Sequence, residues 1–260
     1  MIKFNEMGVS KKLLVAAITF LVIFTITIIS YAIYGFNVLI EDNYAKETLI
    51  SLHLLEEEAN ILKERSRINA TLLATNSNVI KAIEKKDRDE VLAAANKIIT
   101  GLNIEFITLM DQYGEAIARV HTPDKVGGSL AYQDNVKAAM KGETLSVIEA
   151  GNAVKLSART GAPIYNEEGD LVGTVSTGYR FDTEYIVDKL KSLTGNEFTI
   201  FLGDERVSST IMIDGKRAIG TKLDPGIANI ILREGKEFNG EADILGVPYI
   251  TSYKPLRGGE

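Results

Sequence analysis

The chain has 260 residues, with 29 Lys and Arg against 35 Asp and Glu, a formal net charge of −6, no Cys and two His. Its charges are mixed in sign and form no basic stripe, which argues against nucleic acid as a partner. Without Cys there are no disulfides, thiolate metal sites, catalytic thiols or Cys-linked haem. His53 and His121 are too few for a His-rich metal site, so we expect no metal and no cofactor.

An apolar segment near the N-terminus, residues 13–34, contains no charge, no Pro and no Gly. As a helix it would be about 33 Å long, enough to cross a bilayer. The alternative is a cleaved signal peptide, but its apolar core would be shorter and end in a small-residue site. Lys3, Lys11 and Lys12 precede the segment, and Glu41 and Asp42 follow it. We therefore expect the N-terminus inside the cytoplasmic membrane and everything after about residue 41 outside.

A long helix is predicted next, from about residue 43 to 75, because the sequence there lacks Pro and Gly and has helical periodicity. It would continue from the membrane segment as a stalk. One line of small, apolar and polar residues has the spacing of a coiled-coil seam: Leu52, Leu55, Ala59, Leu62, Ser66, Asn69 and Leu73. A second line comprises Leu54, Ile61 and Ile68. Either one face packs on its own domain and the other on a second copy, giving a homodimer, or both form one broad face buried in the chain's own core.

The remaining sequence predicts alternating helices and strands. Helices are expected at 79–85, 88–100, 131–141, 183–193 and 227–233, with Asp182 capping the fourth. Strands are expected at 104–110, 115–121, 144–149, 153–165, 171–179, 197–202, 206–213, 217–220, 238–245 and 247–254. This pattern is typical of an α+β fold with antiparallel sheets.

The sequence after the stalk repeats itself. Ala162-Pro163-Ile164-Tyr165 is followed by a turn and a strand, and Tyr253-Lys254-Pro255-Leu256 by a turn only. We therefore expect two tandem modules, at 76–181 and 182–260, the second without its last strand. That strand and a second transmembrane helix would belong to a longer protein. The full division is 1–12 cytoplasmic, 13–35 transmembrane, 36–75 stalk, 76–181 membrane-distal module and 182–260 membrane-proximal module.

This arrangement resembles the Cache family of PAS-like extracytoplasmic sensors, and most closely the double Cache region of methyl-accepting chemotaxis receptors. The resemblance is carried by these segments: 119–123 with Gly127-Gly128, 162–165 with 169–173, 201–210, 215–221 and 253–256. It implies a dimer, a ligand pocket in the distal module, and a signal passed inward to a cytoplasmic chemotaxis kinase and adaptor through the missing C-terminal part.

Candidate binding residues follow from strand alternation, because alternate residues share a face. Arg119 shares a face with His121, and Lys155 with Ser157 and Arg159. The two sets could converge on one concave face and bind a small carboxylate or an amino acid, closed over by Tyr132. For Lys155 and Arg159 the alternative is a solvated face, and for Ser157 and Tyr132 ordinary packing. The resemblance places Arg119 and His121 at the pocket rim.

Two arginines of the second module, Arg206 and Arg217, are expected to brace its turns. No catalytic triad order and no phosphate-binding glycine loop is present, and the carboxylates lie in turns or at alternating surface positions. We therefore expect no enzymatic activity and no catalytic residues in this chain. Two alternatives to a chemoreceptor stay open: the sensor region of a membrane histidine kinase or cyclase, and a protein-interaction domain that recognises a periplasmic binding protein.

Overall fold

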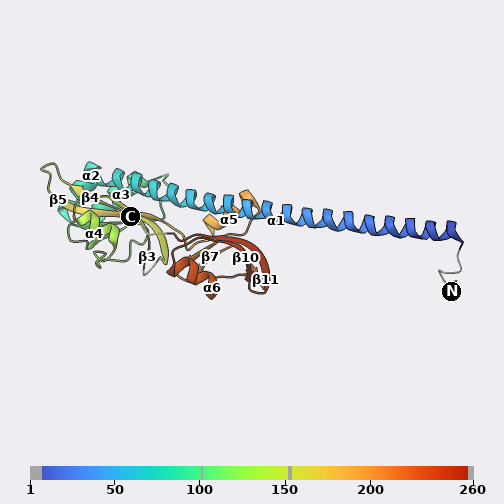
Figure 1. Ribbon diagram of the computed structural model, residues 1–260. Coiled ribbons are helices and arrows are strands. Elements are labelled where there is room, and N and C mark those ends of the chain that lie inside the picture. The colour runs from blue at the N-terminus through green and yellow to red at the C-terminus, as the bar shows by residue number, and fades with distance from the viewer. Residues whose placement is uncertain (1–7, 101, 152–153, 257–260) are drawn as a thin grey trace.

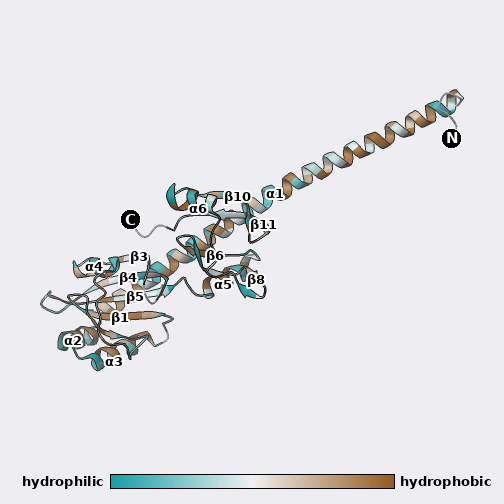
Figure 2. Cartoon of the chain, turned by 90° about the horizontal axis from the view of Figure 1, so that it is seen from below, coloured by the Kyte–Doolittle hydropathy of each residue, from teal (hydrophilic) through white to brown (hydrophobic). Residues whose placement is uncertain are grey.

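The computed structural model describes residues 8–100, 102–151 and 154–256. Its longest element is α1, Val9–Ala74, a helix of 66 residues. This helix joins the apolar segment to the stalk without a break, as predicted. Its N-terminal half extends beyond the rest of the molecule (Figures 1 and 2). In the described part of the chain, α1 is the one helix that is long and apolar enough to cross a membrane.

The C-terminal half of α1 carries the first of two α+β parts. Here α2, Ser77–Lys85, and α3, Arg88–Ile99, accompany a five-stranded antiparallel sheet of order β2-β1-β5-β4-β3. The strands are β1, Phe106–Asp111, β2, Ala116–Arg119, β3, Leu145–Ala150, β4, Leu156–Tyr165, and β5, Leu171–Arg180. The short helix α4, Asp134–Met140, packs mainly on β4 and β5. This part lies at the end of α1 that is farthest from the apolar half (Figure 1).

One face of this sheet packs on α1. The Ser66 hydroxyl lies 3.0 Å from both the carbonyl and the hydroxyl oxygen of Thr177 on β5, and Asn69 donates to the Tyr179 hydroxyl at 2.9 Å. Leu73 is fully buried in the same core. Helices thus cover both faces, which explains why β4 and β5 are buried almost throughout rather than at alternate positions.

The predicted coiled-coil seam of α1 packs against other parts of the same chain. Five of its members are buried against the chain's own modules: Ala59, Leu62, Ser66, Asn69 and Leu73. Leu54, Ile61 and Ile68 of the second line remain 40%, 47% and 58% exposed. Two separate faces therefore exist on α1, and the prediction of a single broad buried face is wrong.

The second α+β part lies beside the middle of α1, between the first part and the apolar half (Figure 1). It contains α5, Tyr185–Thr194, and three strand pairs. These are β6, Thr199–Leu202, with β7, Glu205–Ser209; β8, Met212–Ile213, with β9, Lys216–Arg217; and β10, Phe238–Ile244, with β11, Val247–Tyr253. A short helix α6, Pro225–Ala228, continues into a π-helical turn η2, Asn229–Arg233.

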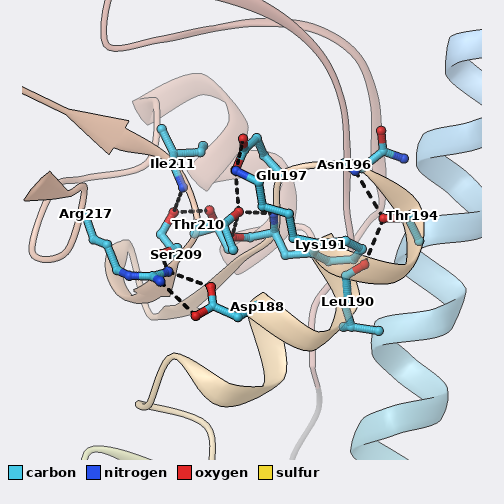
Figure 3. A network of polar contacts seen from close by, with 12 residues as sticks. Asp188, Leu190, Lys191, Thr194, Asn196, Glu197, Ser209, Thr210, Ile211 and Arg217 are labelled. Atoms are coloured by element: carbon cyan, nitrogen blue, oxygen red, sulfur yellow. Dashed lines mark hydrogen bonds and ion pairs between the residues drawn. The ribbon is translucent and has the colours of Figure 1, made fainter. Parts of the chain in front are cut away.

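Arg217 ties this part together. Its guanidinium donates to both carboxylate oxygens of Asp188 on α5, at 2.9 and 2.8 Å, and to the Ser209 carbonyl at 2.8 Å (Figure 3). Arg217 also pairs with Glu184 at 2.9 Å. The expectation that Arg217 braces this region is confirmed.

An opening separates β6 from β11. Both strands line a cavity of about 330 Å³, together with Leu52 and Leu55 of α1. In the five-stranded sheet, β5 occupies the corresponding place between β1 and β4.

Several predicted elements need correction. The strand expected at 206–213 is divided into β7 and β8, because Thr210 turns back to bond Phe198. The helix expected at 227–233 begins at Pro225 and changes to a π turn. Asp182 does not cap α5; it accepts hydrogen bonds from Arg180 and from the Lys155 backbone instead. The start expected for β4 at Ala153 lies outside the described residues.

Candidate ligand-binding site

The second face of the five-stranded sheet carries most of the predicted site residues. Thr108 of β1 is paired with Arg119 on β2 and with Ser176 on β5, so all three share this face. Arg159 of β4 is paired with Gly178 of β5, which shares the face with Ser176. Arg119 and Arg159 therefore project from opposite sides of the same sheet surface, one from β2 and one from β4. The surface between them is made by small side chains of β5.

Arg159 is 5% exposed and points along this face. Its Nε donates to the Ser157 hydroxyl at 2.6 Å, and its guanidinium carbon lies 5.3 Å from the centre of the Phe106 ring. Burial lowers the pKa of Arg159, while nearby Glu149 and Tyr132 act in the opposite direction. Among the described residues no carboxylate oxygen lies within ion-pair distance of this guanidinium. Arg159 is therefore a buried cation that donates its hydrogen bonds to neutral acceptors.

Arg119 is 8% exposed and is enclosed by the loop after β2. Its Nη1 donates to the carbonyl oxygen of Gly127 at 2.6 Å and to that of Lys125 at 3.3 Å. Gly127 and Gly128 have φ values of +65° and +89°, which a residue with a side chain rarely adopts. These glycines allow the loop to fold closely over the guanidinium. The described residues give Arg119 only carbonyl acceptors and no carboxylate.

The N-terminus of α4 covers the centre of the face. Asn135 is fully buried and donates from Nδ2 to the Ser176 hydroxyl at 2.8 Å. It sits so close to β4 that a Cβ added at Gly161 would lie 2.0 Å from the Asn135 backbone oxygen. Glycine is thus required at position 161 for α4 to reach the sheet.

Three acceptor oxygens in this region are buried without a hydrogen-bond partner among the described residues. They are Gln133 Oε1, Asn135 Oδ1 and Glu149 Oε1. The other carboxylate oxygen of Glu149 accepts a hydrogen bond from the Asp134 backbone at 3.3 Å. Burial raises the pKa of Glu149. Buried acceptors of this kind are costly unless something donates to them.

The structure places His121 and Tyr132 at the edge of the face. The His121 ring packs edge-on against Phe106 at 5.9 Å, and its Nδ1 lies 3.1 Å from the Ile107 carbonyl oxygen. Burial is the main cause that lowers the pKa of His121. Tyr132 is 52% exposed and lies near enough to Arg159 to affect its charge. His121 thus contacts Phe106, which also packs against Arg159, and Tyr132 lies near Arg159.

Lys155 lies outside this group, which corrects the prediction that it shares the face with Arg159. It precedes β4, and its amine pairs with Glu205 of β7 at 3.2 Å. Its backbone N–H donates to Asp182 at 2.8 Å. The alternation argument required the strand to extend to Lys155, but β4 begins at Leu156. Lys155 instead links the two α+β parts.

Sequence reasoning missed Phe106, Asn135 and Glu149. Glu149 was assigned to the surface, yet it is half-buried and opposite Ser157 in the β3–β4 pairing. Phe106 could have been found, because its alternation with Thr108 places both on the face of Arg119. Nothing in the sequence pattern indicated Asn135.

Comparisons with known proteins bear on this arrangement. Residues 181–260 match the family described as Single cache domain 3. Three solved structures resemble the chain: a domain of a putative sensory box/GGDEF family protein from Vibrio parahaemolyticus, the sensor domain of the Vibrio cholerae histidine kinase DctB, and the ligand-binding domain of the Campylobacter jejuni chemoreceptor Tlp3 in complex with 4-methylisoleucine. Their TM-scores are 0.53, 0.52 and 0.51, at 14%, 11% and 12% identity. In the same order, the aligned regions cover 78%, 81% and 80% of this chain and 87%, 80% and 83% of the solved chains. The fold is that of Cache-type sensors.

Two curated relatives match over part of this sensor region. The sensor histidine kinase DpiB of Escherichia coli (strain K12) is 25% identical over 134 residues, which is 51% of this chain and 22% of DpiB. The sensor histidine kinase CitA of Klebsiella pneumoniae is 24% identical over 119 residues, which is 46% of this chain and 21% of CitA. The chain spans about a fifth of the length of these relatives. The predicted α+β fold is confirmed, whereas the double Cache division and the chemoreceptor assignment stay predictions.

Proposed function

We propose that this chain is the extracytoplasmic sensing region of a transmembrane receptor and that it binds a small carboxylate or an amino acid on the second face of the five-stranded sheet. One observation carries the proposal. Arg119 and Arg159 are both buried on that face, and no carboxylate oxygen of the described residues lies within ion-pair distance of either. An unpaired buried charge is costly, and a bound carboxylate would neutralise it with bidentate hydrogen bonds.

The buried acceptor oxygens without a hydrogen-bond partner limit which ligands fit this face. A simple carboxylate would satisfy the arginines but would give nothing to Asn135 Oδ1 or Glu149 Oε1. A ligand that also carries an ammonium or hydroxyl group could donate to them. Amino acids and hydroxy acids therefore fit this face better than unsubstituted acids. Ser157 and Tyr132 would orient the carboxylate together with Arg159, and His121 would border it.

The membrane arrangement follows from α1. The apolar half of this helix is exposed along its whole length, as a lipid-facing segment would be. Lys11 and Lys12 stand at its start, and Asp42 follows it, which favours a cytoplasmic N-terminus. The Cache-type part would then lie outside the cytoplasmic membrane, with the five-stranded sheet distal to it.

The same helix offers a route for the signal. It is bonded to the distal sheet through Ser66 and Thr177, and to the proximal part through Glu58 with Lys189 at 2.7 Å. Closure of the distal face on a ligand would shift the sheet against α1, and a rigid helix would carry that shift into the membrane. A second copy packed along Leu54, Ile61 and Ile68 would give the helix a partner to move against.

Two proposals can be made for the cytoplasmic domain that receives the signal. The curated relatives are named sensor histidine kinases, which favours a kinase. The resemblance of the sequence motifs to double Cache chemoreceptors favours a methyl-accepting receptor that acts on a separate chemotaxis kinase and adaptor. Both require sequence beyond this chain, and both use the same sensing region.

A thermal-shift screen of the chain in lipid nanodiscs tests the binding proposal. Amino acids, hydroxy acids, simple carboxylates and amines would be compared at equal concentration. A ligand present at about a hundred times its Kd stabilises the folded state by about 2.7 kcal/mol, which raises the melting temperature by several degrees. A shift from amino acids or hydroxy acids supports the proposal. A blank across the panel would contradict it and favour recognition of a protein partner.

A further inference from the structure

A third buried arginine without a carboxylate partner lies in the proximal part. Arg206 of β7 is 3% exposed. Its Nη1 donates to the Thr221 hydroxyl at 2.7 Å and to the Lys222 carbonyl at 3.1 Å. Its Nε is buried and has no hydrogen-bond partner among the described residues. The described carboxylates lie beyond ion-pair distance from it, so its charge is balanced by dipoles, among them the Tyr253 hydroxyl, and by the Phe201 ring, 5.0 Å from the guanidinium carbon.

Arg217 of the same part provides the contrast. That arginine is held by Asp188 and Glu184, both within 3.0 Å. An arginine that braces a turn is paired in this way, because the partner repays the cost of ordering and partly burying its charge. Arg206 lacks such a partner although it is more deeply buried. Arg206 does brace the turn at Thr221 and Lys222, as expected, but that role leaves its Nε without a hydrogen-bond partner among the described residues.

Arg206 also lines a cavity. This cavity has a volume of about 280 Å³, and apolar side chains form much of its wall: Leu223, Ile227, Ala242 and Ile244. Tyr253 completes the polar side next to Arg206. Burial raises the pKa of the Tyr253 hydroxyl, and the charge of Arg206 opposes that rise. The site thus combines one cation, one phenol and an apolar wall.

The acidic groups at this cavity limit what it can bind. Asp224 and Asp243 are exposed and line it, but each is engaged with backbone N–H groups, Asp224 at 2.8 Å from Gly226 and Asp243 at 2.8 Å from Gly246. Lys222 is paired with Asp204 at 2.8 Å. Arg206 is a cation without a carboxylate partner among the described residues, and two carboxylates also line the cavity. This arrangement favours a ligand with a single negative charge, since a second would be repelled.

We infer that Arg206 anchors a second ligand site, in the proximal part, for a small monocarboxylate with a short apolar chain. The carboxylate would bind the guanidinium and the Tyr253 hydroxyl, and the chain would lie against Leu223 and Ile227. This site differs from the one proposed on the distal sheet in its position and in its single unpaired arginine. It would let one receptor respond to two ligands.

Isothermal titration calorimetry with propionate tests the inference on the chain in nanodiscs. Removing a charge-assisted hydrogen bond of this kind costs about 1.5–3 kcal/mol, so Arg206→Met should weaken propionate binding at least about tenfold. Arg217→Met is the matched control, because it removes a paired arginine of the same part and should leave the affinity unchanged. Arg159→Met separates the sites: propionate that still binds to this variant is not bound at the distal face.

Three results would overturn the inference: an Arg206→Met variant that binds propionate as the unaltered chain does, equal binding of the uncharged analogue propionamide, or no saturable binding of any acid from formate to butyrate. Ala242→Leu gives an independent test if Arg206→Met does not fold. It fills the cavity without changing a charge and should weaken butyrate more than formate. If Arg206→Met lowers the melting temperature but leaves the affinity for propionate unchanged, Arg206 has only a structural role.

Discussion

Arg159 and Ser157, two residues apart on β4, are joined by a hydrogen bond of 2.6 Å from Nε to the hydroxyl oxygen. Ser157 is completely buried, so no water replaces its hydroxyl when it is removed. The bond holds the guanidinium at Nε, and its Nη2 donates to the Val154 carbonyl oxygen at 3.5 Å. This pair is the structural basis of the site that we propose on the distal face.

The hydroxyl of Ser157 should therefore matter for both stability and binding. Ser157→Ala leaves the buried Nε of Arg159 without an acceptor, which we expect to cost about 1–3 kcal/mol in the free energy of unfolding. Ligand affinity should fall as well, because the guanidinium is no longer held at Nε. Urea unfolding and calorimetry measure the two effects. Ser146→Ala is a control, because that half-buried hydroxyl bonds only Thr160 on the neighbouring strand.

Gly161 should tolerate no side chain. In Gly161→Ala the new Cβ would meet the backbone oxygen of Asn135 at 2.0 Å, so α4 must move away from the sheet. Overpacking of this kind costs about 1–3 kcal/mol, and ligand binding should weaken with it. Gly35→Ala is the control, since a Cβ there meets nothing within 4 Å. Equal melting temperatures for Gly161→Ala and the unaltered chain would disprove the close contact.

The exposed line on α1 should meet its counterpart in a second copy. The chain has no Cys, so single substitutions report contacts between copies without background. Ile61→Cys and Ile68→Cys should form disulfide-linked dimers in membranes under mild oxidation. Leu62→Cys should not, because Leu62 is 4% exposed and packs inside its own chain. Equal crosslinking at positions 61 and 62 would argue against a dimer along this line.

Glu149 should make the stability of the unliganded chain depend on pH. Burial raises its pKa in the folded state, so the folded protein keeps the proton to a higher pH than the unfolded chain. Its contribution to the free energy of unfolding therefore falls as pH rises above the unfolded value of about 4.3. Glu149→Gln should remove this loss, so its stability relative to the unaltered chain should rise between pH 4 and 7. A difference that is constant over this range would contradict the assignment.

The positions of helices and strands could be predicted from the sequence more accurately than the burial of the charged side chains. Strand-forming segments and turns in the sequence identified β1, β2, β4 and β5. Alternation placed Arg159 on the same face as Ser157, because the period of a strand is independent of its surroundings. It could not tell that helices cover both faces, so a solvated face stayed the alternative for Arg159. Lys155 was misplaced because a shift of one residue in the start of β4 decides whether alternation applies. Strand ends are set by tertiary contacts such as that of Asp182 with Lys155, which the local sequence does not record.

Arg206 and Arg217 also show that the local sequence does not predict the tertiary contacts of a charged residue. Both lie in short strands beside turns, and the sequence around them predicts the same role. They differ only in whether a distant carboxylate reaches them, as Asp188 reaches Arg217. That difference depends on how α5 packs on β9. It follows from the assembled fold rather than from the sequence near either arginine.

The most direct test of the account compares ligand affinity in Arg159→Met and Lys155→Met, using the best ligand from the thermal-shift screen. Both variants lose one positive charge at the same end of β4, but only Arg159 lies on the proposed binding face. Calorimetry should show a loss of at least about tenfold for Arg159→Met and an affinity within about twofold of the unaltered chain for Lys155→Met. Unchanged affinity in a folded Arg159→Met variant, or an equal loss in both, would contradict a ligand site on this sheet.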